Sequence, residues 1–241
     1  MSKEIALSGR EDVSRFMVHL TRDDRKDYKN GATARKNLLG ILHDQKILAL
    51  APHCLFNPRI AKLTERNAKR FNTVCLTETP LNQLHLLVRE IPGRRIKLAP
   101  YGICFRKQFI VRSGGQPAIY INSYDDNQWL RECVDELYQI SVTSSSVEAP
   151  LWRILPFINA MHEGYDFSWE REWRVRGDLT FSARNIVCLI LPEDGEDDLK
   201  ERMAQNGVAT ISPGWTYEQI VAELARQQRS TRSLSKAIEA K

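Results

Sequence analysis

Apolar residues recur along the chain at two spacings, and their order predicts a fold that mixes strands with helices. Phe16 to Thr21 alternates with a period of two, which places His19 and Thr21 on one face of a strand. A helical spacing of three and four follows at Leu38, Ile41 and Leu42. Because strands and helices do not alternate strictly, we expect an α+β domain with a mixed or antiparallel central sheet and flanking helices.

The same patterns predict the later elements. Strands are expected over residues 73–77, 101–106, 117–122 and 185–191, and the last is a continuous apolar run typical of a strand buried on both faces. Helical stripes are expected after Pro80, after Asp125 or Asp126, over 151–161 and over 195–206. Thr216 to Gln219 has the pattern of a capping box that opens another helix.

A long segment, residues 50–72, is basic and shows no apolar periodicity. Its cations in the run 59–70 are Arg59, Lys62, Arg66, Lys69 and Arg70. Long connections of this kind are usually functional or mobile, so we expect the segment to be mobile or to cover a cleft. A solvated loop and a contact for a nucleic-acid or protein acceptor are both compatible with the run 59–70.

The bulk properties set limits on the class of protein. The chain has 241 residues, of which 42% are hydrophobic, and a formal net charge of +5 that permits an anionic partner without requiring one. We expect an N-terminal lead-in over 1–15, one domain over 16–228 and a flexible basic tail over 229–241. The start of the chain lacks an apolar leader and no apolar run reaches membrane length, so we expect a cytoplasmic protein without a membrane partner.

Several chemistries lack their motifs. The five cysteines show no C-x-x-C spacing, and Cys75, Cys104, Cys133 and Cys188 lie in apolar contexts, which indicates reduced core thiols. The histidines lack metal-ligand spacing, so no metal site is expected. There is no Walker loop, no G-x-G-x-x-G and no G-x-S-x-G.

The run from Trp169 to Arg176 is the strongest candidate for chemistry. On a strand with period two, Glu170 and Glu172 would face the same side, followed by Arg174. Two carboxylates at the start of a buried strand are costly unless cations or hydrogen-bond donors meet them. The run can therefore be a structural ladder of ion pairs with the arginines, or it can carry a catalytic glutamate that acts on a cationic ligand or a ribose. The residues alone leave both interpretations open.

The order of short motifs along the chain carries a resemblance. The motifs are His-x-Thr, Asn-Leu-x-x-Ile-Leu, Tyr-Gly-Ile-x-Phe, Pro-x-x-Tyr and Glu-x-Glu-Trp-Arg, spread over roughly residues 16–225. This order resembles that of bacterial ADP-ribosyltransferase-fold proteins, most nearly the AbiGi-like abortive phage resistance families and more distantly the DarT-type toxins. The resemblance implies an ADP-ribosyltransferase-like fold that uses NAD.

The resemblance also implies roles for single residues. A histidine at the position of His19 would hold the ribose of NAD, and the backbone at Thr21 would bind the nicotinamide amide. Glu172, or Glu170 as the second choice, would be catalytic. The other expected cofactor-binding residues are Asn37, Tyr101, Tyr120 and Arg106, and an arginine such as Arg106 or Arg22 would suit the pyrophosphate.

The implied function is that of an NAD-dependent ADP-ribosyltransferase or NAD glycohydrolase. Such a protein would act inside a bacterial cell as a toxin or anti-phage effector, with a possible cognate antitoxin or defence-system partner. The alternative is a non-catalytic antitoxin or nucleic-acid-binding module on the same fold, which the basic run 59–70 favours.

Overall fold

The computed structural model describes residues 13–24, 31–91, 97–143, 151–161, 163, 166 and 168–227, so the predicted tail and most of the predicted lead-in lie outside the described residues. Contacts divide the chain into two units whose segments alternate in sequence. The first unit comprises Met1–Gly40, Glu78–Gln108 and Ala183–Lys241, and the second comprises Ile41–Thr77 and Phe109–Ser182. The expectation of one domain over residues 16–228 stays a prediction.

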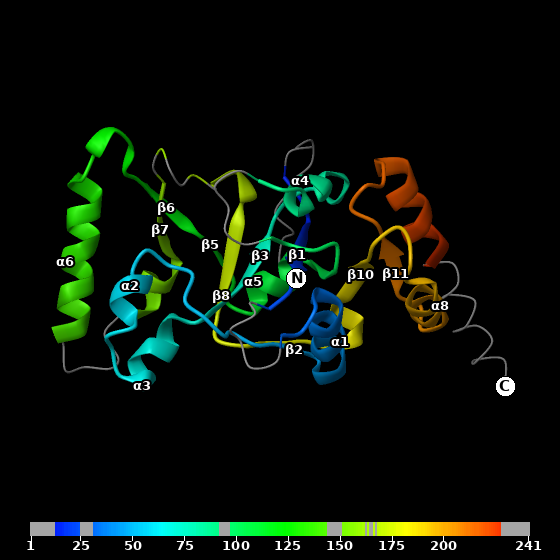
Figure 1. The fold of residues 1–241 in the computed structure, drawn as a ribbon, viewed down its shortest axis with the longest axis horizontal. Coiled ribbons are helices and arrows are strands. Elements are labelled where there is room, and N and C mark those ends of the chain that lie inside the picture. Colours follow the sequence, from blue (N-terminus) through cyan, green and yellow to red (C-terminus); the bar gives the residue numbers. More distant parts are fainter. Residues whose placement is uncertain are drawn as a thin grey trace, which may run out of the picture. The chain divides into compact units, whose positions relative to one another are not determined.

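Four strands form the sheet of the first unit, in the order β11-β10-β4-β1 (Figure 1). They are β1 (Phe16–Leu20), β4 (Gly102–Arg106), β10 (Ile186–Ile190) and β11 (Ala209–Ile211). β4 pairs antiparallel with β1 and with β10, whereas β10 and β11 are parallel. The expected strands at 16–21, 101–106 and 185–191 are thereby confirmed. β11 was not expected, because three residues are too few to show a period.

The helices of this unit are α1 (Ala34–Asp44, whose last residues belong to the second unit), η2 (Leu81–Gln83), α4 (His85–Val88), η6 (Ala183–Asn185), α8 (Asp197–Gln205) and a helix over residues 217–227. Those that add buried apolar side chains to the core of the sheet are η2, α4 and the helix over residues 217–227. The core contains Leu84 and Leu87 from the segment after Pro80, together with Cys104 and Cys188 from facing strands. The expected helical stripe after Pro80 is confirmed as a buried face, although it is split between η2 and α4.

The expected capping box is present at the start of the last described helix. The Thr216 N–H donates to Oε1 of Gln219 at 2.8 Å, and the Gln219 N–H donates to Oγ1 of Thr216 at 3.4 Å. These reciprocal bonds satisfy two backbone donors that a helix N-terminus leaves without intrahelical partners.

The second unit contains short strands in four ladders. β3 (Thr73–Thr77), β8 (Glu172–Arg176) and β5 (Gln116–Pro117) are antiparallel neighbours. β6 (Ile119–Asn122) pairs in parallel with β7 (Ile158–Met161), and β2 (Lys46–Ile47) pairs antiparallel with β9 (Leu179–Thr180). The two units together are mixed α+β with mostly antiparallel pairing, which confirms the coarse fold class.

The basic segment 50–72 is folded, so the first of its two expected alternatives, a mobile loop, is wrong, and the second, that it covers a cleft, stays a prediction. It forms α2 (Asn57–Ile60), α3 (Glu65–Ala68) and η1 (Lys69–Phe71), and the isolated bridge Pro52–Asn72 ties its ends together. Phe56 and Phe71 are almost fully buried in the core of this unit. The expectation failed because the apolar anchors are spaced irregularly between the cations, so no period reveals them.

The rest of this core comes from α6 (Trp129–Thr143), η4 (Leu155–Phe157), β6 and β7, and the short helix α7 (Leu151–Ile154) precedes η4. The helix expected over 151–161 is wrong in its second half, because Ile158 to Met161 form β7. Cys133 is exposed on α6, although its apolar neighbours suggested a core position. All five cysteines are free thiols. Within the described part of the chain, no helix has both the length and the apolar character needed to cross a bilayer.

Candidate functional site

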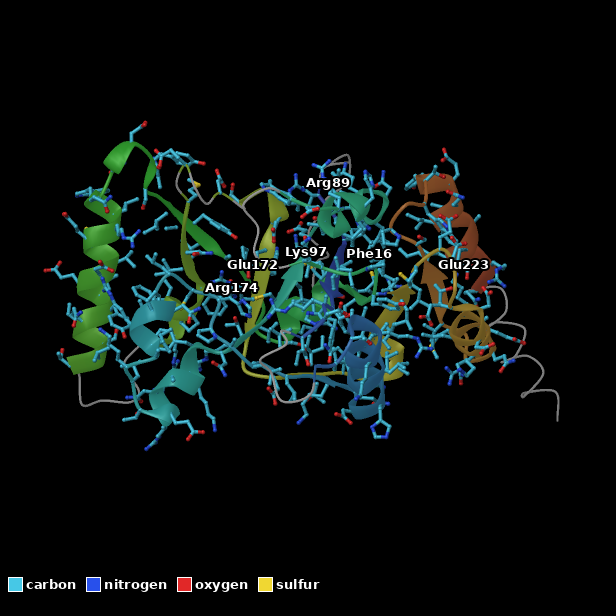
Figure 2. All side chains as sticks on the ribbon, viewed as in Figure 1. Phe16, Arg89, Lys97, Glu172, Arg174 and Glu223 are labelled. Carbon is cyan, nitrogen blue, oxygen red and sulfur yellow. The ribbon has the colours of Figure 1, made fainter. Side chains whose placement is uncertain are left out.

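Glu172 and Arg174 form a bidentate ion pair at the start of β8. Nε of Arg174 donates to Oε1 of Glu172 at 3.0 Å, and Nη2 donates to Oε2 at 2.7 Å. Both residues are labelled in Figure 2, and the period-two geometry of a strand places their side chains on the same face of β8. Nη1 of Arg174 donates to the Pro156 carbonyl at 2.9 Å. Arg174 is fully buried, whereas 15% of the Glu172 side chain remains exposed.

The pair keeps the carboxylate charged despite its surroundings. Burial alone would raise the pKa of Glu172, but the charge and hydrogen bonds of Arg174 outweigh that effect and hold the pKa below its usual range. Burial likewise opposes the charge of Arg174, and the attraction of Glu172 more than compensates and raises the pKa of the guanidinium. The result is an ionised carboxylate in a fixed orientation, on a side chain that is mostly shielded from solvent.

Two further side chains contact this carboxylate. The Tyr120 hydroxyl on β6 donates to Oε2 of Glu172 at 3.2 Å, and the Cys75 thiol on β3 is hydrogen-bonded to the same carboxylate. Burial first, and the Glu172 charge second, raise the pKa of both groups, so both remain protonated donors. The strand register explains the position of Cys75, because it pairs directly with Arg174, two residues from Glu172.

Sequence reasoning named Tyr120 and Glu172 and missed two of their neighbours. Cys75 could have been found from the alternation of residues 73–77, which places it on one face of its strand. The charge of His53 also lowers the pKa of Glu172, after the larger effects of Arg174 and Cys75. No signal in the sequence points to His53, because it lies in the irregular segment 50–72.

Glu170 does not share the strand with Glu172, which corrects the expectation of a continuous Glu-x-Glu strand. It ends the short helix η5 (Ser168–Glu170), and Arg171 between the two glutamates has a φ of +48°. The Thr77 hydroxyl donates to the Glu170 carbonyl at 2.6 Å. The left-handed residue breaks the period of two, so β8 begins at Glu172.

In the first unit, Thr21 and Tyr101 are joined at the ends of β1 and β4. The Thr21 N–H donates to the Tyr101 carbonyl at 2.7 Å, and the Thr21 carbonyl accepts from the Ala99 N–H at 2.9 Å. The buried Thr21 hydroxyl donates to the Ala34 carbonyl at 2.8 Å. The Thr21 N–H already donates its one hydrogen bond. The Thr21 carbonyl accepts one bond and has a second lone pair, so it is the backbone group that could accept a hydrogen bond from a ligand amide.

The remaining predicted residues of the first unit occupy separate positions. His19 is half-buried on the face of β1 that also carries Thr21. Asn37, near the start of α1, donates from Nδ2 to the Arg22 carbonyl at 2.9 Å and to Oδ1 of Asp24 at 3.1 Å, so it holds the segment after β1. Arg106 is exposed at the last position of β4. Their roles toward NAD stay predictions.

A buried carboxylate that sequence reasoning missed lies beside Tyr101. The Tyr101 hydroxyl donates to Oε1 of Glu196 at 2.9 Å, and Nε of Arg35 donates to both oxygens of Glu196 at 2.8 and 3.0 Å. Burial, and then the hydrogen bond and charge of Glu196, raise the pKa of Tyr101. These contacts engage the Tyr101 hydroxyl in the structure of its own unit.

A second ion pair of the first unit also went unnoticed in the sequence. Nζ of Lys107 lies 2.6 Å from Oε1 of Glu78, and both side chains are largely shielded from solvent. Glu78 directly follows β3 and Lys107 directly follows β4. The sequence feature that could have predicted this pair is the charged residue at the end of each strand.

The chemistry available at these sites is that of carboxylates, a phenol and a thiol. No group of three or more His, Cys, Asp or Glu side chains within the described ranges is arranged to hold a metal ion. Comparisons with protein-family models, with curated proteins and with solved structures find no match to this chain.

Proposed function

We propose that this protein is an NAD-dependent ADP-ribosyltransferase or NAD glycohydrolase that acts inside a bacterial cell as a toxin or anti-phage effector. The observation that carries the proposal is the state of Glu172. Its carboxylate is ionised and is oriented by Arg174 and Tyr120, and 15% of the side chain remains exposed. We choose NAD as the substrate because of the order of the short motifs along the sequence.

The chemistry requires such a carboxylate. Breaking the bond between nicotinamide and ribose leaves positive charge on the sugar carbon, and a carboxylate oriented in advance stabilises that charge without reorganising during the reaction. One such group contributes roughly 3–4 kcal/mol to the transition state. The positive charge of Arg174 offsets part of the attraction between Glu172 and the sugar cation. Arg174 also keeps Glu172 ionised, and a protonated Glu172 would not stabilise the cation in this way.

The proposal assigns the other residues by the resemblance. His19 and the Thr21 carbonyl bind the nicotinamide ribose and amide, and Arg106 binds the pyrophosphate, while Asn37 and Tyr101 support the cofactor-binding segments. Glu170 would orient the acceptor. The acceptor itself is a nucleic acid, a protein or water, and water would make the protein a glycohydrolase.

The deciding experiment compares wild type with Glu172→Gln. Turnover of NAD is measured by nicotinamide release, per folded molecule and well below the melting temperature of both proteins. The substitution keeps the shape and removes the charge that acts in the transition state, so turnover should fall on the order of 10²–10³-fold while NAD affinity changes little. Turnover of folded Glu172→Gln at the wild-type rate, or no NAD consumption by wild type, would contradict the proposal.

One observation favours the alternative of a non-catalytic antitoxin or nucleic-acid-binding module. Lys62 and Arg66 are exposed in the folded basic segment, where they could meet phosphates. Two other cations of this run, Arg59 and Lys69, are paired with Asp135 and Glu65, which weakens the positive field. Nucleic-acid binding that falls on removal of Lys62 and Arg66, with no NAD turnover, would support this alternative instead.

A further inference from the structure

A groove along α6 in the second unit, to which α2 contributes Arg59, has a lining of mixed chemistry. Both helices are labelled in Figure 1. Its volume is about 530 Å³, within the range of small-ligand sites. The lining residues are Arg59, Trp129, Glu132, Cys133, Asp135 and Glu136, with Gln139. Nothing in the proposed NAD chemistry uses this groove.

Arg59 is held rigidly at the groove and lacks a full set of partners. Nη2 donates to Oδ2 of Asp135 at 2.8 Å, and the guanidinium carbon lies 5.6 Å from the ring centre of Tyr138. That ring is itself stacked on Phe56. Nη1 is buried and has no hydrogen-bond partner among the described residues. Nη1 is shielded from solvent, so a ligand in the groove can meet only the exposed part of this side chain, which is 40% exposed.

The helix α6 supplies the other half of the groove. Trp129 is 68% exposed, which is unusual for a large aromatic side chain, and its ring face is free to stack on a cation. Glu132 and Glu136 follow at positions i+3 and i+7, so they lie along the same face of the helix and are exposed. The charges of Arg59 and Asp135 cancel because the two side chains form an ion pair. Glu132 and Glu136 therefore give the lining of the groove a net negative charge.

We propose that this groove binds a basic peptide segment of a partner protein. A lysine or arginine side chain lies over Trp129 between Glu132 and Glu136, and a main-chain carbonyl of the peptide accepts from the exposed side of the Arg59 guanidinium. The charge decides against a nucleic-acid strand, because its phosphates would meet the carboxylates. The geometry requires both an acceptor and a cation on one ligand, and a basic peptide supplies both.

The probe is the fluorescein-labelled peptide acetyl-Arg-Gly-Lys-Gly-Arg-amide, titrated into the full chain and followed by fluorescence anisotropy. The double variant Trp129→Ala with Glu136→Gln should weaken binding at least about tenfold, because it removes the stacking surface and one carboxylate. Both positions are exposed, so the variant should melt like wild type. Arg59→Lys should also weaken binding while it keeps a cation beside Asp135.

The matched control is Tyr217→Ala with Glu218→Gln in the first unit. Tyr217 is 66% exposed and has an adjacent exposed glutamate on a helix, so the control removes the same kinds of group elsewhere. It should bind the peptide like wild type. The proposal is overturned if wild type shows no binding up to millimolar peptide, or if the control weakens binding as much as the groove variant. It is equally overturned if the groove variant loses binding of a labelled oligothymidylate while its peptide affinity is unchanged.

Discussion

Arg174 turns back along its own strand to hold Glu172, with 3.0 and 2.7 Å between their paired atoms. The two residues are separated by Trp173, whose side chain faces the other side of β8. The ion pair neutralises a fully buried guanidinium, as the structural interpretation of the sequence requires, and 15% of the Glu172 side chain remains exposed, so a catalytic part for the carboxylate stays a prediction. Experiments must therefore separate its contribution to stability from any part in a reaction.

We expect Arg174→Met to lower the free energy of unfolding by about 3–5 kcal/mol, because it leaves the Glu172 charge largely buried without its partner. The double variant Glu172→Leu with Arg174→Met should lose less than Arg174→Met alone, since both charges are then replaced by apolar groups. Urea unfolding of wild type, of the single variants Arg174→Met and Glu172→Leu, and of the double variant gives the values.

The double variant also controls for the hydrogen bond to the Pro156 carbonyl, which both variants lose. A double variant that loses as much as the sum of the single variants would mean that Glu172 and Arg174 are not coupled.

The lowered pKa of Glu172 predicts a loss of stability in acid. A carboxylate whose pKa is lower in the folded protein contributes stability above its unfolded pKa, about 4.3, and this contribution is lost as the pH falls through the lower folded value. We expect Glu172→Gln to reduce the dependence of unfolding free energy on pH below about 4.3. The control is Glu90→Gln, because Glu90 pairs with Lys97 at the surface and its removal should leave the acid dependence nearly unchanged.

The elements that could be predicted from the sequence are those with a sustained period. Residues 16–21 and 185–191 showed their strands because each has five or more residues in one pattern, and the capping box at Thr216 showed the helix that follows it. Residues 158–161 were assigned to a helix because Leu155, Ile158 and Met161 happen to fit helical spacing. Their parallel pairing with β6 is a tertiary contact that no local pattern reveals.

The candidate site was predictable only in part, because some of its contacts are tertiary and leave no local pattern in the sequence. Glu172 stood out because charged residues flank an apolar strand, and Arg174 follows two residues later in the same strand. Tyr120, Cys75 and His53 reach the carboxylate from three other segments, so their proximity depends on the fold. Arg171 adopts a left-handed conformation that its residue type does not suggest, and it removed Glu170 from the strand.

The folded segment 50–72 predicts a large effect at a position that the sequence presented as a loop. Phe56 is almost fully buried and stacks on Tyr138 with ring centres 4.8 Å apart. Phe56→Ala should lower the unfolding free energy by about 3–5 kcal/mol, because a cavity replaces the ring. The neutralising variant Arg66→Gln with Lys69→Gln changes exposed residues of the same segment and should cost little stability. A small loss for Phe56→Ala would mean that the segment is not part of the core in solution.

Tyr120 offers the clearest test of whether the surroundings of Glu172 serve a reaction. Its hydroxyl donates to Oε2 of Glu172 at 3.2 Å, and burial with the nearby carboxylate keeps it protonated well above the ordinary pKa of tyrosine. Tyr120→Phe removes this one donor and leaves the Arg174 bonds in place. The loss of one hydrogen bond should lower the unfolding free energy by only about 1 kcal/mol.

If Glu172 stabilises a cation during NAD cleavage, its orientation matters more for turnover than for folding. Turnover by Tyr120→Phe should then fall about tenfold with little change in KM, because the hydroxyl acts through the carboxylate and not on the bound cofactor. The variant Tyr124→Phe is the matched control, since its hydroxyl bonds to Asp166 in the same unit and does not contact Glu172. If both variants lower turnover equally, or if Tyr120→Phe raises KM alone, then Tyr120 does not position Glu172 for the reaction.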